Sequence, residues 1–66
     1  MYNFGRSVRM ALAKRGMGTG AAAREMGVTQ QTIRRWKRGN GVNMKTLEEI
    51  AEICDLDFEE VLAYGK

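Results

Sequence analysis

Apolar side chains recur along this chain at the three- and four-residue spacing of an α-helix, not at the alternating spacing of a strand. One such set predicts a helix from about Phe4 to Arg15, and another predicts a helix from about Met44 to Cys54. The apolar positions are Phe4, Val8, Ala11 and Leu12 in the first and Leu47, Ile50, Ala51 and Cys54 in the second. Each set falls on one face, so each helix is expected to bury that face.

Shorter segments between and after these two helices show similar spacing. A helix is predicted from about Thr19 to Met26, another from its N-cap Thr29 to about Arg38, and a last one from Asp57 to about Tyr64. The chain has no Pro and no alternating or β-branched run, which argues against strands. The expected fold is therefore all-α, a compact bundle of about five short helices.

Small polar residues and glycines mark the expected helix ends. Asn3, Thr29 and Asn43 stand where N-caps are expected. Gly27 stands where a left-handed residue would end the second helix. The segment from Asp57 to Glu60 has the form of a capping box in which Asp replaces the usual Ser or Thr.

Several apolar residues fit core packing better than a binding surface. Trp36 lies three residues after Ile33 on the inward face of the third helix, although stacking on a base is the alternative. Cys54 lies on the apolar face of the fourth helix as a small hydrophobic residue. The methionines expected to fill the core are Met10, Met17, Met26 and Met44.

The length of 66 residues allows one small domain over residues 1–66, with a thin core. The chain has no His and no nucleophile–base pair, which argues against an enzyme. A single Cys argues against a disulfide framework and, with no His, against a metal site. Apolar runs fall short of the about 7–15 residues of a signal sequence and the about 20 of a membrane span. We expect a cytoplasmic protein with no membrane contact, cofactor or small-molecule ligand.

The net charge of +3 is divided unevenly along the chain. Residues 1–45 hold ten Lys or Arg and one acid, Glu25, which is a net charge of +9. Residues 46–66 hold seven acids and one base, Lys66, which is a net charge of −6. Four basic residues crowd into the segment from Arg34 to Arg38. This division favours a polyanionic partner for the first two-thirds of the chain. Pairing of the two segments with each other on folding is the alternative.

The segment from Thr19 to Arg38 carries the most specific pattern. Numbered from one to twenty, it has the small Ala23 at position five, where two helices cross closely. Gly27 stands at position nine, where the turn needs a residue that tolerates positive φ. The positions that must be apolar are four, eight, ten, fifteen and eighteen, and they hold Ala22, Met26, Val28, Ile33 and Trp36. We therefore interpret residues 19–38 as a helix-turn-helix.

With one helix before the motif and two after it, the chain resembles the Cro and phage-repressor proteins, the lambda-repressor-like or XRE-type helix-turn-helix family. The stretch from Gly27 to Ile33 is similar to the start of a recognition helix in that family. The resemblance covers nearly the whole chain. It implies a bundle of about five helices that binds operator DNA, commonly as a dimer, and represses transcription. The short chain favours a Cro-like stand-alone domain, from a phage or prophage, that acts at the nucleoid.

Two positions depart from the pattern of that family. Where members usually have a Gln that contacts DNA, this chain has Thr19, so the base contact is lost while a phosphate contact remains open. Many members also pair an Arg in the first helix with an acid late in the recognition helix. The aligned residues here are Leu12 and Lys37. Since both partners are replaced together, no buried charge is left alone.

A recognition helix presents its N-terminal residues to base edges in the major groove. Gln suits adenine, Arg suits guanine, and the Thr methyl group packs on thymine. Residues four apart, such as Gln31 and Arg35, can face the groove together. The predicted base-reading residues are Thr29, Gln30, Gln31, Arg34 and Arg35. Capping is the alternative for Thr29, and phosphate binding is the alternative for both arginines.

Other polar residues are expected at the DNA backbone, where cations, loop amides and helix N-termini bind phosphate. The predicted phosphate-binding residues are Thr19, Lys37, Arg38, Asn40, Asn43 and Lys45. For Asn43, a plain N-cap is the favoured alternative. A homodimer on DNA is expected to meet through the C-terminal third of the chain. The predicted interface residues are Val42, Phe58, Leu62 and Tyr64, although Phe58 and Leu62 would serve equally to complete the monomer core.

Two other functions remain open at this point. The first is an antitoxin or accessory regulator of a two-gene module, but the residues after Tyr64 are too few for a toxin-binding segment. The second is a protein-interaction module that kept the fold without binding DNA, which the basic third helix argues against.

Overall fold

The computed structural model describes residues 1–66 and has a helix at every predicted place. The five helices are α1 (Phe4–Arg15), α2 (Thr19–Met26), α3 (Gln30–Lys37), α4 (Met44–Cys54) and α5 (Phe58–Ala63). No residue is in a strand, so the predicted all-α bundle is confirmed. None of the helices combines the length and the apolar character that a membrane crossing needs.

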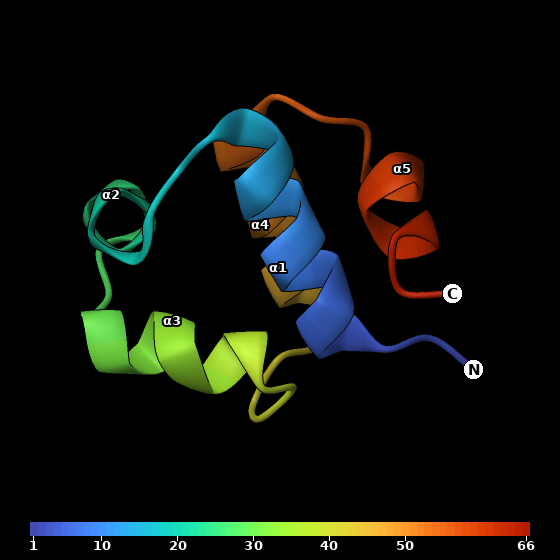
Figure 1. Ribbon diagram of the computed structural model, residues 1–66, viewed down its shortest axis with the longest axis horizontal. Coiled ribbons are helices and arrows are strands. Elements are labelled where there is room, and N and C mark those ends of the chain that lie inside the picture. Colours follow the sequence, from blue (N-terminus) through green and yellow to red (C-terminus); the bar gives the residue numbers. More distant parts are fainter.

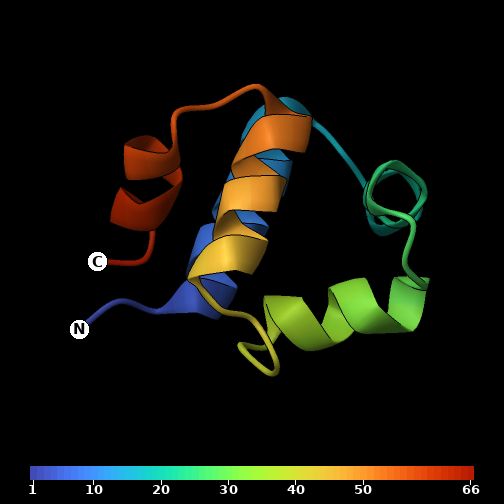
Figure 2. The ribbon, with the colours of Figure 1, turned by 180° about the vertical axis from the view of Figure 1, so that it is seen from behind.

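α1 and α4 lie side by side through the middle of the molecule (Figure 1). α2 and α3 lie on one side of this pair, with the C-terminal end of α3 beside the N-terminal end of α1, and α5 packs on the other side. The same arrangement is seen from behind in Figure 2, where α4 is in front. This arrangement leaves one long side of α3 at the outer edge of the molecule, and both chain termini near α5.

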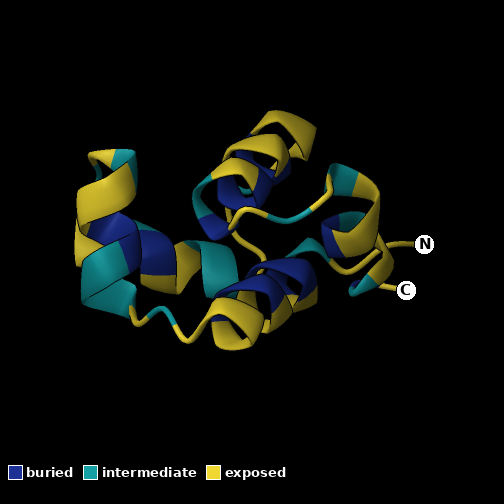
Figure 3. Ribbon diagram, turned by 90° about the horizontal axis from the view of Figure 1, so that it is seen from above, coloured by how far each residue is buried: buried dark blue, intermediate teal, exposed yellow.

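The inward faces of the five helices meet in one apolar core (Figure 3). Large residues such as Leu12, Ile33 and Ile50 are almost fully buried, and each contributes about 1.5–3 kcal/mol by leaving water. Cys54 is buried among them, and this burial raises the pKa of its thiol, which the positive charge of Arg15 partly opposes. The predicted core role of Cys54 is therefore confirmed. The half-buried residues packed on the core include Met17, Met26 and Trp36, as predicted.

Two methionines that were predicted to fill the core lie outside it. Met10 is 43% exposed and Met44 is 47% exposed. Met10 is two residues away from both Val8 and Leu12, which places it on the opposite side of α1 from the buried face. Met44 is the first residue of α4, before the buried face of that helix begins. The core assignment of these two residues is therefore wrong.

Three helices begin with the predicted side-chain caps. The side-chain oxygens of Asn3, Thr29 and Asn43 accept hydrogen bonds from backbone amides at 3.0, 3.2 and 2.9 Å. Each bond satisfies an amide that has no partner within its helix. At the other end of α2, Gly27 has a φ of 68°, the left-handed conformation predicted for it.

The capping box predicted at the start of α5 is wrong. Asp57 occupies the N-cap position, but its side chain makes no capping hydrogen bond. The Glu60 carboxylate, which would reach back to Asp57 in a capping box, instead accepts a hydrogen bond from the Tyr64 hydroxyl. This hydrogen bond raises the pKa of the Tyr64 hydroxyl, because it favours the neutral form.

A close approach of two backbones places the end of α3 on α1. A β-carbon on Gly5 would lie 2.7 Å from the Gly39 nitrogen and 2.8 Å from the Lys37 carbonyl oxygen. The Arg9 guanidinium donates a hydrogen bond to the same carbonyl. The first turn of α1 therefore meets the end of α3 at a point where a residue without a side chain is required.

The two ends of the chain are also joined. The Asn3 amide donates a hydrogen bond to the Gly65 carbonyl at 2.7 Å. The Arg6 Nε donates to the Tyr64 carbonyl at 3.0 Å. These bonds hold the C-terminal end of α5 against the start of α1, on the side of the molecule away from α2.

Replacing Gly5 by Ala is expected to lower the free energy of unfolding by about 1–3 kcal/mol, because the added methyl group meets the backbone at the end of α3. Gly20→Ala is the matched control, since its β-carbon would meet the Gln30 side chain at an ordinary contact distance of 3.5 Å. That variant is expected to raise the free energy of unfolding by up to about 1 kcal/mol. Urea titration measures both effects. Equal stability of the two variants would contradict the close approach.

Candidate nucleic-acid interface

α2 and α3 meet through the small and apolar residues of the predicted motif. Ala23 is buried at the crossing, and the Val28 amide donates to the Ala23 carbonyl at 3.0 Å across the turn that contains Gly27. On α3, Ile33 is fully buried and Trp36 is half-buried against the core. The turn and the inward face of residues 19–38 therefore have the geometry predicted for a helix-turn-helix.

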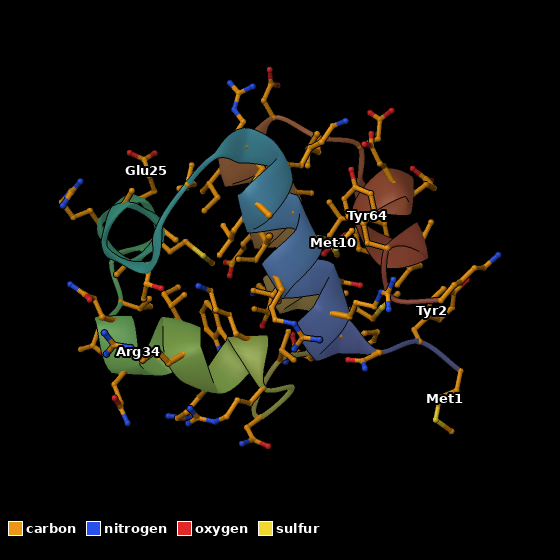
Figure 4. The ribbon with its side chains drawn as sticks, viewed as in Figure 1. Met1, Tyr2, Met10, Glu25, Arg34 and Tyr64 are labelled. Carbon is orange, nitrogen blue, oxygen red and sulfur yellow. The ribbon has the colours of Figure 1, made fainter.

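The opposite face of α3 is turned to solvent. All of the residues predicted to read bases are exposed, and they are Thr29, Gln30, Gln31, Arg34 and Arg35. Arg34 projects from α3 near the lower edge of the molecule (Figure 4). The structure thus brings amide and guanidinium groups together on one accessible helix surface, which offers both donors and acceptors of hydrogen bonds.

Three of these side chains, those of Thr29, Gln30 and Arg34, already have partners within the protein. The Thr29 Oγ1 accepts from the Thr32 amide and shares a second hydrogen bond with the Thr32 hydroxyl at 3.0 Å. The capping role of Thr29 is therefore confirmed, and its methyl group is the part left for a contact with thymine. The Arg34 Nη2 donates to the Gln30 Oε1 at 3.4 Å, one turn away on the same face.

Arg35 leans toward the loop that follows α3. A β-carbon on Gly41 would lie 3.0 Å from the Arg35 Nη2, so the guanidinium covers this glycine. Gly41 has a φ of 74°, a left-handed conformation that turns the loop back toward α3. From this position the Arg35 guanidinium is near both the exposed face of α3 and the loop backbone.

Lys37 differs from the other basic residues of α3 because it is half-buried and its side-chain partner lies on another helix. The Lys37 Nζ donates a hydrogen bond to the Thr19 Oγ1 at 2.9 Å, which joins the end of α3 to the start of α2. These are two of the residues that depart from the family pattern. The structure therefore connects the two departures, which lie 18 residues apart in the sequence.

The other predicted phosphate-binding residues lie in or beside the loop between α3 and α4. Arg38, Asn40 and Lys45 are exposed. The Asn43 Oδ1 accepts from both the amide and the hydroxyl of Thr46, at 2.9 and 3.0 Å. Asn43 is therefore the N-cap of α4, the role that was favoured over phosphate binding in the sequence analysis. Its side-chain nitrogen remains free for another contact.

The basic side chains do not form hydrogen bonds with carboxylates. Those that donate reach neutral acceptors, namely the carbonyls of Tyr64 and Lys37, the Gln30 amide and the Thr19 hydroxyl. This argues against mutual pairing as the reason for the uneven charge. Glu25, the one acid among the first 45 residues, points away from α3 (Figure 4).

A hollow of about 210 Å³ lies on the side of α2 and α4 where Glu25 projects. Its lining residues are Glu25, Met26, Glu49, Glu52 and Ile53. No group of three or more acidic, Cys or His side chains in the chain is arranged to hold a metal ion. The acids of α2 and α4 thus gather away from the exposed face of α3 and leave its positive charge uncompensated.

The predicted dimer residues are all half-buried and pack against the core of their own chain. They are Val42 in the loop before α4, Phe58 and Leu62 on α5, and Tyr64 just after it. Tyr64 lies on the α5 side of the molecule, away from α2 (Figure 4). The inner side of each of these residues helps to complete the core, and the outer side remains accessible.

Sequence reasoning missed the residues that hold α3 in place. Gly5 gave a usable signal, because a glycine within a helical pattern often marks a close packing contact. Arg9 gave none, because its hydrogen bond to the Lys37 carbonyl crosses 28 positions.

The hydrogen bond between Lys37 and Thr19 is expected to stabilise the packing of α2 on α3. Thr19→Val and Lys37→Met each remove one partner and keep most of the side-chain volume. Each is expected to lower the free energy of unfolding by about 0.5–1.5 kcal/mol, and the double variant by about as much as either one. Urea titrations of the four proteins measure this coupling. Fully additive effects would show that the two side chains act independently.

Residues 8–61 match the helix-turn-helix family HTH_3. The match begins within α1 and ends within α5, so it includes the whole α2–α3 unit and most of the chain. No curated protein and no solved structure shows a significant match. The family is one of DNA-binding regulators, and the match agrees with the geometry of the turn and of the inward face of α3. The chain belongs to the helix-turn-helix family of lambda-repressor-like, or XRE-type, DNA-binding regulators.

Proposed function

We propose that this protein is a sequence-specific repressor of Cro type, which binds a near-palindromic operator in double-stranded DNA as a dimer. The observation that carries this proposal is the division of α3 into a buried apolar face and an exposed face of amide and guanidinium groups. The major groove of DNA, about 12 Å wide, admits a helix and displays a distinct set of donors and acceptors for each base pair. We place this activity at the nucleoid of a bacterial or phage-infected cell.

The N-terminal part of α3 carries the base contacts in this proposal. Gln31 is exposed and has no hydrogen-bond partner within the protein, so both ends of its amide are free to pair with adenine. The Thr29 methyl group packs on a thymine methyl group. The remaining groove-facing residues are Gln30, Arg34 and Arg35, with Arg35 placed so that it also reaches the backbone beside the loop.

Phosphate contacts surround this face. The N-cap of α2 is Gly18, which has no side chain to cap the helix, so the first amides of α2 remain free for an anion. Thr19 is the first residue of α2, and the ammonium of Lys37, at the end of α3, reaches it through their hydrogen bond. On the other side of α3, the backbone contacts are assigned to the exposed Arg38, Asn40 and Lys45 and to the free side-chain nitrogen of Asn43.

A dimer would present two copies of α3 to successive major grooves, about 34 Å apart. The proposed interface is formed by Val42, Phe58, Leu62 and Tyr64, whose outer sides remain open. Acidic residues of α4 and α5 also lie in this part of the chain. Placing them at or behind the dimer contact keeps them away from the phosphates.

Selection of bound sites from a random DNA library tests the proposal directly. The parent protein is expected to enrich a near-palindrome whose half-sites are about one helical turn apart. Gln31→Ala is expected to relax one base position in each half-site, at a cost of about 1–3 kcal/mol in specific binding. Enrichment of no motif, together with the absence of salt-dependent binding, would favour the protein-interaction module instead. An unchanged motif for Gln31→Ala would show that α3 is seated differently.

The salt dependence of DNA binding tests the phosphate contacts separately. Lys45→Ala is expected to weaken specific and non-specific binding alike, and to lower the slope of log affinity against log salt by about one unit per protomer. Lys66→Ala removes the same charge from the terminus beside α5, so its slope is expected to stay unchanged. Fluorescence anisotropy over a series of salt concentrations measures both slopes. Equal slopes for the two variants would remove Lys45 from the contact surface.

A further inference from the structure

The Gln30 side chain lies over Gly20, at the start of α2. A β-carbon on Gly20 would lie 3.5 Å from the Gln30 Nε2 and 3.9 Å from the Gln30 Cδ. The amide of Gln30 therefore rests on the start of α2, although the residue as a whole is exposed on α3. Its nitrogen faces α2, and its oxygen faces along α3.

The oxygen of this amide is the partner of Arg34. The Arg34 Nη2 donates to the Gln30 Oε1 at 3.4 Å, so the Gln30 amide lies between the start of α2 and the guanidinium. A guanidinium has five N–H donors in a fixed plane, and this contact uses one of them. The remaining donors can still form the two parallel hydrogen bonds by which Arg recognises O6 and N7 of guanine.

We infer that Gln30 is a positioning residue, which orients Arg34 toward a guanine in the major groove and does not read a base itself. This inference rests on the proposed function, because it assigns separate roles to the residues of the proposed DNA-binding face of α3. Bidentate recognition of adenine would require both the nitrogen and the oxygen of the Gln30 amide. In the structure the nitrogen faces α2 and the oxygen accepts from Arg34. The two atoms are therefore not free to pair together with one base.

The same geometry separates Gln30 from Gln31. Gln31 is exposed and makes no hydrogen bond with another side chain, so its amide is available to a base. Arg34, oriented by Gln30, then specifies a different base pair. Each half-site is therefore expected to contain one position read by the Gln31 amide and one G·C pair read by Arg34.

Binding sites selected from random DNA by the parent protein and its variants test this division. Arg34→Ala is expected to lose the preference for one G·C pair by about tenfold or more. Gln30→Ala is expected to weaken the preference at the same base pair and at no other. The double variant is expected to match Arg34→Ala alone, because Gln30 acts only through Arg34. Gln30→Glu keeps an oxygen acceptor for Arg34, so it is expected to retain the G·C preference even if the added charge lowers overall affinity.

Gly20→Ala is the matched control, because its β-carbon would reach only ordinary contact with the Gln30 amide. It is expected to leave the selected motif unchanged. The inference is overturned if Gln30→Ala relaxes a different base pair, or if Arg34→Ala changes no base preference while the parent still selects a motif. Either result leaves the proposed repressor function intact. Failure of the parent protein to select any motif overturns the proposed function and the inference together.

Discussion

The position of α3 depends on one contact, the meeting of its C-terminal end with the first turns of α1. Gly5 allows the two backbones to approach more closely than a side chain would permit, and Arg9 donates to the Lys37 carbonyl at that point. The Lys37 ammonium then reaches back to Thr19, so one residue connects α3 to both α1 and α2. In a chain this short the core is thin, and such backbone-level contacts supply rigidity that a larger core would provide elsewhere.

This placement of α3 also determines which charges can meet a polyanion. Because the inner side of α3 is used for packing, its amide and guanidinium groups are collected on the outer side. Glu25 points away from that side, and the remaining acids belong to residues 46–66. The basic residues on the outer side of α3 therefore create a positive field on that side of the helix.

The helices and most of their caps could be predicted because the interactions that form them are local. Asn3 caps an amide three residues later, and Gly27 takes a conformation that its own lack of a side chain permits. The predictions that failed were overridden by other contacts. Glu60 found a partner in Tyr64 and left Asp57 without a capping box. Met10 was assigned by residue type, whereas the face of α1 on which it lies determined its exposure.

The candidate site divides in the same way. Helical periodicity was enough to predict which residues line the outer side of α3, but the state of each side chain depends on distant partners that no local pattern reveals. Lys37 and Thr19 show this most clearly, since each departs from the family pattern and each is the other's partner. The short Thr19 side chain leaves room for the longer Lys37 side chain, whose ammonium donates to the Thr19 hydroxyl. An acid at the position of Lys37 would instead need a cation on α1 as its partner. The two departures are therefore joined by one hydrogen bond, which connects α2 to α3 and lies beside the basic end of α3.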